Sequence, residues 1–198
     1  KSSVDFMTNA QKLVNNWLLV KGFSVGFGDV SLPPAIADQV SQKLTAFADE
    51  MLYVISTTEN QYGSRKMTPA KFEQNLYMRS KLVLSEMSSF VKAHIDHDNS
   101  FYIMSTAGSK GSPVNAGQIM ACVGGQNIMN RRPQKTFNGR SLPYFCRDDN
   151  SPAARGFVFS SYSKGLTGPE AFFHQMGGRE GMIDTALKTA EVGYTNNK

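Results

Sequence analysis

The C-terminal part of the chain combines a helical pattern with glycines, which helices normally disfavour. Thr167 and Glu170 have the three-residue spacing of a capping box, so a helix is expected to begin there. Gly177, Gly178 and Gly181 follow inside the helical pattern, at a cost of about 1 kcal/mol each relative to alanine. We therefore expect a long final helix in which these glycines meet a requirement that outweighs their cost.

Small residues occupy one face of this expected helix. They are Gly178, Gly181, Thr185 and Thr189, with Ala186, Ala190 and Gly193 beside them. Close packing of a second helix is the more common reason for such a face, and the pattern alone favours it. A flat base pair needs the same kind of surface, because a large side chain would hold the base away. The residues themselves leave both interpretations open.

The first hundred residues are expected to form amphipathic helices. Apolar residues recur at helical spacing over 6–18 and stop at Gly22, as in a helix with a glycine C-cap. Pro34 is placed to begin a second helix and Pro69 a third. These two would pair as an antiparallel hairpin with its turn at 61–65, and their apolar stripes are most simply packing surfaces.

The segments that follow the hairpin are shorter and less regular. Residues 101–104 predict a strand that leads into the small-residue loop 105–112, and residues 113–122 predict a short helix. Residues 126–145 are expected to be irregular or weakly β. The expected fold class is mainly α with minor β, in which a helical hairpin is followed by an irregular linker and one long C-terminal helix.

Positive charge is concentrated in the second half of the chain. The net charge is +5, and all of this excess lies after residue 104. The basic side chains that cluster there are Arg131, Arg132, Lys135, Arg140, Arg147 and Arg155. Such a cluster would create a positive field for an anion, although a solvated basic loop is the simpler interpretation of the composition.

The cysteines and the hydropathy pattern favour a reducing compartment without a membrane. Cys122 and Cys146 occur without a glycosylation sequon and are expected to be reduced packing residues, a disulfide being the less favoured alternative. No apolar run approaches the ~20 residues that span a bilayer. Nothing at Lys1 has the pattern of a secretory leader.

One long stretch carries a family resemblance. Residues 156–194 read GFVFSSYSKGLTGPEAFFHQMGGREGMIDTALKTAEVGY. This stretch resembles the approach to, and most of, the bridge helix in the largest subunit of multisubunit DNA-directed RNA polymerases. In that family the bridge helix crosses the active-centre cleft, and its small face lies against the pair of template and transcript. The resemblance therefore favours the base-pair interpretation of the small face.

The resemblance implies roles for two groups of residues in this helix. The residues that would contact the template base at or next to the addition site are Thr185, Ala186, Thr189, Ala190 and Tyr194. The residues that would form a hinge packed on the funnel domain are His174, Gly177, Gly178, Arg179, Glu180 and Gly181. We interpret His174 as a structural hydrogen-bonding group and not as a general base.

A second resemblance concerns the entry path of nucleotides. Residues 108–112 read GSKGS and residues 121–126 read ACVGGQ. By itself the loop is an ordinary surface turn, and its lysine precedes the glycine, unlike the order of a P-loop. In the polymerase family this region lies beside the pore through which nucleoside triphosphates enter. The resemblance implies that Lys110 meets the triphosphate and that Gln126 belongs to the same NTP-entry region.

Two shorter resemblances extend the assignment over nearly the whole chain. Residues 22–26 (GFSVG) resemble an element at the end of the pore region, and residues 140–145 (RSLPYF) resemble the linker between the funnel and the bridge helix. The expected division is 1–33 end of the pore region, 34–139 funnel domain, 140–166 linker and 167–198 bridge helix, which stops in mid-element by comparison with the family. Met129 and Asn130 depart from the family, which carries a small residue in a Gly-Lys-Arg run there.

The implied function is RNA synthesis as part of a complete DNA-directed RNA polymerase. The family's Asn-Ala-Asp-Phe-Asp-Gly-Asp type motif is absent, so Mg²⁺ would be bound by residues outside this chain, and the chain alone should be inactive. His94, Asp96, His97 and Asp98 could ligate a metal, but a solvated helix end is the favoured interpretation, and no metal site is expected. The implied partners are the other subunits, especially the second-largest, template DNA, the RNA–DNA hybrid and nucleoside triphosphates, with no membrane. The implied location is the nucleus, or the host cytoplasm or virion for a viral enzyme.

Two other classes of function are compatible with parts of the sequence. The hairpin and the basic linker could form a non-catalytic module that binds a regulator and nucleic acid. An independent nucleotide-binding enzyme could be built around Lys110, although the order of residues in its loop does not favour this. The small face of the final helix argues against the non-catalytic module.

Overall fold

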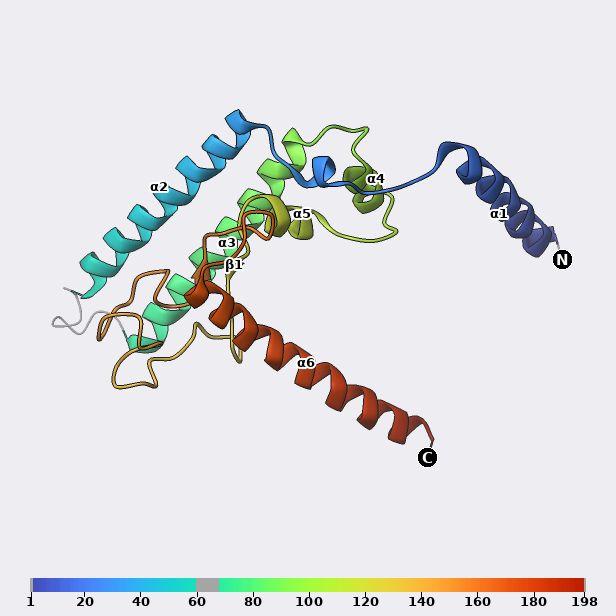
Figure 1. The fold of residues 1–198 in the computed structure, drawn as a ribbon. Helices are drawn as coiled ribbons and strands as arrows, with labels where there is room; N and C mark the ends of the chain where they lie inside the picture. Colours follow the sequence, from blue (N-terminus) through green and yellow to red (C-terminus); the bar gives the residue numbers. More distant parts are fainter. Residues whose placement is uncertain (1, 60–67, 198) are drawn as a thin grey trace.

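The chain folds as a helical hairpin that carries smaller elements on one side and a long helix at each end (Figure 1). A computed structural model describes residues 2–59 and 68–197. The elements in chain order are α1 (Ser2–Lys21), the 3-10 helix η1 (Phe27–Val30), α2 (Pro34–Glu59), α3 (Pro69–His94), α4 (Ser100–Thr106), α5 (Pro113–Met120), β1 (Gly124–Gly125), β2 (Phe157–Val158) and α6 (Gly168–Asn196). The prediction of a mainly α fold with minor β is confirmed.

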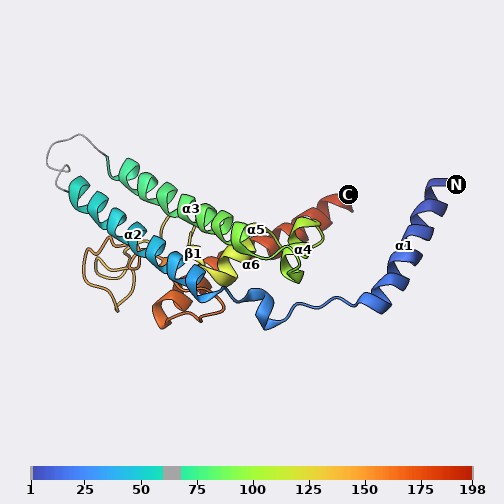
Figure 2. The same ribbon diagram turned by 90° about the horizontal axis from the view of Figure 1, so that it is seen from above.

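The predicted end of the first helix and the predicted starts of the second and third are also confirmed. Gly22 ends α1 with a φ of +68°, and its N–H donates to the carbonyl of Leu18 at 2.8 Å. The hydroxyl of Thr68 accepts from the N–H of Lys71 at 3.4 Å, with Pro69 in the first turn of α3. Helices α2 and α3 lie side by side in both views (Figures 1 and 2). The turn predicted at 61–65 lies outside the described residues.

The hydrophobic core lies between the hairpin and the elements packed on it. Its fully buried members include Met51 from α2, Leu76 from α3 and Phe157 from β2. Helix α5 lies directly against α3, since a Cβ added to Gly117 would meet the Oγ of Ser88 at 2.5 Å and its Cα at 3.0 Å. A glycine at this position therefore permits the close approach of the two helices.

The prediction of a strand over residues 101–104 is wrong, because this segment belongs to α4. The side chain of Asn99 accepts from the N–H groups of Phe101 at 2.9 Å and Tyr102 at 3.2 Å. This N-cap satisfies donors that a short helix would otherwise leave free, and Phe101 is buried in the core. Capping and burial thus outweigh the preference of aromatic and β-branched residues for strands.

Strand pairing is limited to one short antiparallel sheet. Gly124 pairs with Val158, and Gly125 pairs with Phe157. The weakly β character predicted for 126–145 is confirmed by two isolated bridges, one at each of two turns. This sheet brings the segment after α5 next to the segment that leads into α6.

The terminal helices project away from the hairpin (Figure 1). Helix α1 buries none of its described residues, and its apolar side chains, including Phe6 and Trp17, are exposed. Within the described part of the chain, no helix combines the length and apolar character needed to cross a bilayer.

Candidate functional site

Helix α6 consists of an attached N-terminal part and an exposed C-terminal part. Phe173 is 1% exposed, and its ring stacks on Phe145 of the linker with centroids 6.0 Å apart. In contrast, residues 181–196 are all exposed. The helix is therefore fixed to the body over its first turns and projects from it (Figure 1).

Glu170 attaches the first turn of α6 to the segment after β2. Its carboxylate accepts from the N–H of Phe159 at 2.9 Å, from the N–H and hydroxyl of Ser160 at 3.1 and 2.8 Å, and from Thr167 at 2.9 and 2.8 Å. Partial burial alone would raise the pKa of Glu170, but the hydrogen bonds from Thr167 and Ser160 lower it below its usual value. The capping box predicted from the sequence is confirmed, whereas no sequence pattern indicated the bonds to Phe159 and Ser160.

His174 forms a second attachment through a chain of hydrogen bonds. Its Nδ1 lies 3.1 Å from Oε1 of Gln126, and its Nε2 lies 3.2 Å from the hydroxyl of Tyr162. Nε2 of Gln126 donates to the carbonyl of Gly124, which turns the amide oxygen toward His174. Nδ1 of a neutral His174 therefore carries the proton, and Nε2 accepts from Tyr162. Both ring nitrogens of His174 thus have hydrogen-bond partners, as expected for a structural histidine.

Glu180 provides a third attachment, one turn and a half further along α6. Both carboxylate oxygens accept from the N–H of Met129, at 2.9 and 2.8 Å. Met129 and Asn130 have φ values of +50° and +58° and form the centre of a tight turn closed by Ile128 and Arg131. The carboxylate of Glu180 thus provides a hydrogen-bond acceptor for the N–H of Met129, which has no acceptor within the turn.

The glycines of α6 differ in their surroundings. A Cβ added to Gly177 would meet the carbonyl oxygen of Asn127 at 3.4 Å and Oε1 of Gln126 at 3.5 Å. At Gly178 and Gly181, in contrast, a Cβ would meet no atom of the described chain within 4 Å. A Cβ at Gly177 would thus make only ordinary contacts with the body, and no described residue packs on the small face beyond it.

The predicted template-contact residues all lie on the exposed part of α6. They are Thr185, Ala186, Thr189, Ala190 and Tyr194. The hydroxyl of Thr185 donates to the carbonyl of Gly181 at 2.9 Å, and that of Thr189 donates to the carbonyl of Thr185 at 2.8 Å. Both hydroxyls therefore have hydrogen-bond acceptors within the helix and need no partner from another part of the structure.

The two residues predicted for NTP entry are not brought together. Lys110 is exposed in the loop between α4 and α5, where Gly108 and Gly111 have φ values of +72° and +79°. The side chain of Gln126 is bonded to His174 instead. Gln126 thus belongs structurally with the attachments of α6, and the sequence contained no signal of this pairing.

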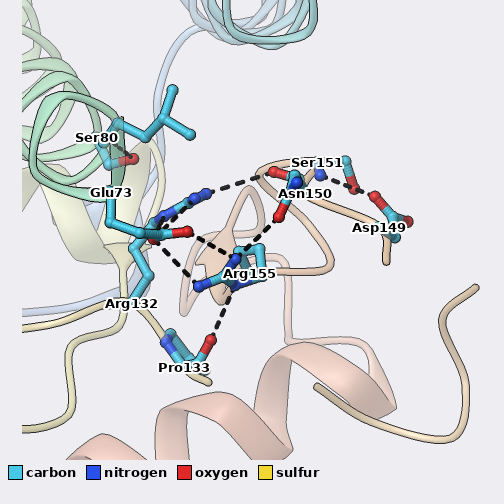
Figure 3. Close-up of polar contacts among 9 residues, drawn as sticks. Glu73, Ser80, Arg132, Pro133, Asp149, Asn150, Ser151 and Arg155 are labelled. Atoms are coloured by element: carbon cyan, nitrogen blue, oxygen red, sulfur yellow. Dashed lines mark hydrogen bonds and ion pairs between the residues drawn. The ribbon is translucent and has the colours of Figure 1, made fainter. Parts of the chain in front are cut away.

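Two members of the predicted basic cluster are buried and paired, so they do not contribute to an open positive surface. The side chains of Arg132 and Arg155 are 4% and 8% exposed, and both contact Glu73 of α3 (Figure 3). Arg155 donates to Glu73 from both Nη atoms, at 2.9 and 3.1 Å, and from Nε to the carbonyl of Pro133. This correction leaves Arg131 as an exposed member of the cluster.

Arg132 shares the same carboxylate. Its Nε donates to Oε2 of Glu73 at 3.1 Å, while its buried Nη2 lies 3.0 Å from that oxygen without hydrogen-bond geometry. Burial, together with the positive charge of Arg155, lowers the pKa of Arg132 to about 10, and Glu73 opposes this shift. One carboxylate thus holds two buried guanidinium groups.

The remaining candidate ligands have local partners. Nδ1 of His94 lies 2.8 Å from the carbonyl of Phe90, and Oδ1 of Asp96 accepts from the N–H of Asp98. Across residues 2–59 and 68–197, His, Cys, Asp and Glu side chains do not gather in groups of three or more that could hold a metal ion.

Comparison with known proteins places these features in one family. Residues 56–158 match the model of RNA polymerase Rpb1, domain 4, and residues 165–198 match that of RNA polymerase Rpb1, domain 5. The chain is 38% identical over 196 residues to DNA-directed RNA polymerase III subunit RPC1 of Trypanosoma brucei brucei. That alignment covers 95% of this chain and 12% of the relative.

Proposed function

The chain belongs to the family of the largest subunits of DNA-directed RNA polymerases, and from this premise we propose that it lines the NTP-entry funnel and supplies the bridge helix. Helix α6 is the bridge helix in this proposal, and the hairpin with its attached elements is the funnel domain. Residues 1–33 end the pore region, and residues 140–166 link the funnel to the helix.

The division of α6 into attached and exposed parts is the observation that carries this proposal. A helix that contacts a template base must keep one face free, and it must be held firmly enough to orient that face. Glu170, His174 and Glu180 supply the attachments, and residues 181–196 supply the exposed part. The family match extends over this helix, which favours a base pair over a second helix as the occupant of its small face.

The contact to template DNA comes from the small face in this proposal. Thr189 and Ala190 lie next to the base at the addition site, with Thr185, Ala186 and Tyr194 beside them. The RNA–DNA hybrid adjoins the same face, and the second-largest subunit closes the other side of the cleft. The hinge is the segment from His174 to Gly181, where Gly178 and Gly181 have room to leave helical geometry.

Lys110 acts on nucleoside triphosphates as they enter. Its exposed ammonium group, in a loop that two glycines shape, offers a mobile point charge to a polyphosphate. In this role the ammonium group must attract the triphosphate without holding it in one fixed position, because the nucleotide must move on to the active centre.

The chemistry of nucleotide addition is carried out elsewhere in the polymerase. Divalent cations stabilise the attacking and leaving oxygens in such reactions, and their usual ligands are clustered carboxylates. The described residues do not provide such a cluster, and we place the Mg²⁺ ions on residues outside this chain. We assign the enzyme to the nucleus on the strength of its relative, a subunit of RNA polymerase III.

The proposal is tested by Thr189→Arg in the assembled polymerase. The arginine would fill the face intended for the base pair, so elongation should slow by more than about tenfold, which corresponds to ~1.4 kcal/mol in the barrier. Thr189→Ala is the matched control, since it keeps the face small. Elongation by Thr189→Arg at the rate of the control would contradict template contact.

A further inference from the structure

We propose that Glu73, a residue of the hairpin, is a positioning residue for α6. Two carboxylates of α6, those of Glu170 and Glu180, are each hydrogen-bonded to a segment outside the helix, and Glu73 anchors both of these segments. The inference rests on the proposed function of α6. Glu73 acts through other residues and touches neither template nor nucleotide in this proposal.

The first connection runs through Arg132. This guanidinium donates to Glu73, and its residue directly follows the turn that contains Met129. The N–H of Met129 is bonded to both carboxylate oxygens of Glu180. The last attachment of α6 is therefore separated from Glu73 by its ion pair with the buried Arg132 and a few residues of backbone.

The second connection runs through Arg155. Both of its Nη atoms donate to Glu73, and its residue stands two positions before β2. The N–H groups of Phe159 and Ser160, immediately after β2, donate to Glu170. The first attachment of α6 is therefore also held by Glu73.

The two connections depend on a single carboxylate. Arg132 and Arg155 are both buried, and their side chains face Glu73 from two segments of the chain (Figure 3). Loss of the negative charge would leave two buried cations facing each other, and they would separate. The turn at Met129 and the end of β2 would then no longer be held in place by the same side chain.

A small displacement at these attachments is amplified along α6. Residues 181–196 extend for about 24 Å at 1.5 Å per residue, so a tilt of about 5° moves the far end by about 2 Å. Errors of about 1 Å in the placement of a reacting group already cost large factors in rate. Glu73 would therefore influence elongation although it lies on the hairpin.

The experiment compares Glu73→Gln, Glu180→Gln and the double variant in the assembled polymerase. Each single variant should slow elongation at saturating nucleoside triphosphate by about fivefold, with an unchanged KM. The double variant should stay within about twofold of Glu73→Gln alone, because Glu73 already acts through the attachment that Glu180 makes, and residues that share a connection are not additive. Hydrogen exchange over residues 171–196 should rise in all three variants.

A matched control is available on the same hairpin. Glu50 also pairs with an arginine, Arg79, but on the surface of the hairpin. Glu50→Gln should leave elongation and the exchange of α6 at wild-type values. Its effect, if any, should multiply with that of Glu180→Gln.

Two results would overturn the inference. One is a fully multiplicative double variant, and the other is wild-type exchange over 171–196 in Glu73→Gln. If Glu73→Gln does not assemble, Glu73→Asp carries the same test, since it keeps the charge but is too short to reach both arginines in their present positions. Thr189→Arg separates the two proposals, because unchanged elongation in that variant contradicts the proposed function whatever Glu73 does.

Discussion

Both carboxylate oxygens of Glu180 accept a hydrogen bond from the backbone N–H of Met129, at 2.9 and 2.8 Å. Met129 has a φ of +50°, a backbone conformation that residues other than glycine rarely adopt. The last attachment of α6 thus depends on a strained turn. It also depends on the backbone of Met129 and not on its side chain, which is 78% exposed.

The strain at this turn predicts that Met129→Gly stabilises the chain. Glycine adopts a positive φ without steric cost and keeps the N–H that Glu180 needs, so the free energy of unfolding should rise by up to about 1 kcal/mol. Denaturant unfolding measures this change. Asn130→Gly is the matched control and should have a smaller effect, because asparagine tolerates the left-handed region. A destabilised Met129→Gly variant would contradict this account of the turn.

The open surroundings of Gly178 predict opposite effects on helicity and on function. A Cβ there meets no atom of the described chain within 4 Å, so Gly178→Ala should raise the helicity of α6 by removing a penalty of about 1 kcal/mol. In the polymerase the same change should alter elongation or pausing, because the hinge becomes stiffer. Circular dichroism and elongation assays measure the two effects. Raised helicity with unchanged elongation and pausing would argue against a hinge at this residue.

The hydrogen bonds at Glu170 predict an acid-sensitive attachment. Its pKa is lower in the folded state than in the unfolded chain, so the unfolded state binds more protons as the pH falls. The stabilisation is complete above the unfolded pKa and is lost as the pH falls through the lower, folded pKa. Glu170→Gln should therefore be less stable at neutral pH and should show a flatter decline in stability on acidification. Parallel pH profiles for the variant and the wild type would contradict this.

The two cysteines should differ in reactivity. Burial raises the pKa of Cys122 to about 12, while Cys146 is exposed. A thiol reagent at mildly alkaline pH should therefore label Cys146 in the folded chain and reach Cys122 only after unfolding. Mass spectrometry of labelled peptides distinguishes the two sites, and rapid labelling of Cys122 in the folded chain would contradict the core described here.

Local sequence signals were sufficient to predict the long helices. Pro34, Pro69 and Gly22 mark helix ends through their own backbone preferences, and the structure places helix ends at each of them. Residues 101–104 were predicted wrongly because the side chain of Asn99 decides their conformation from outside the segment. A capping residue was thus more informative than the propensity of the segment itself.

The attachments of α6 were much less predictable. Glu170 and Thr167 are three residues apart, so their capping box could be recognised from spacing. Glu180 and Met129 are 51 residues apart, and Arg155 and Glu73 are 82 apart, and no local pattern links either pair. Both interpretations of the basic cluster, a positive field for an anion and a solvated loop, assumed exposed side chains, because charge counts do not report burial.

Contact between α6 and the template is best tested with a photo-crosslinking amino acid at residue 189 of the largest subunit in a stalled elongation complex. We expect a crosslink to the template base at or next to the addition site. The same probe at position 187, on the opposite side of the helix, should crosslink to protein. Crosslinks from position 189 to protein alone would contradict the assignment of α6 as the helix that contacts the template.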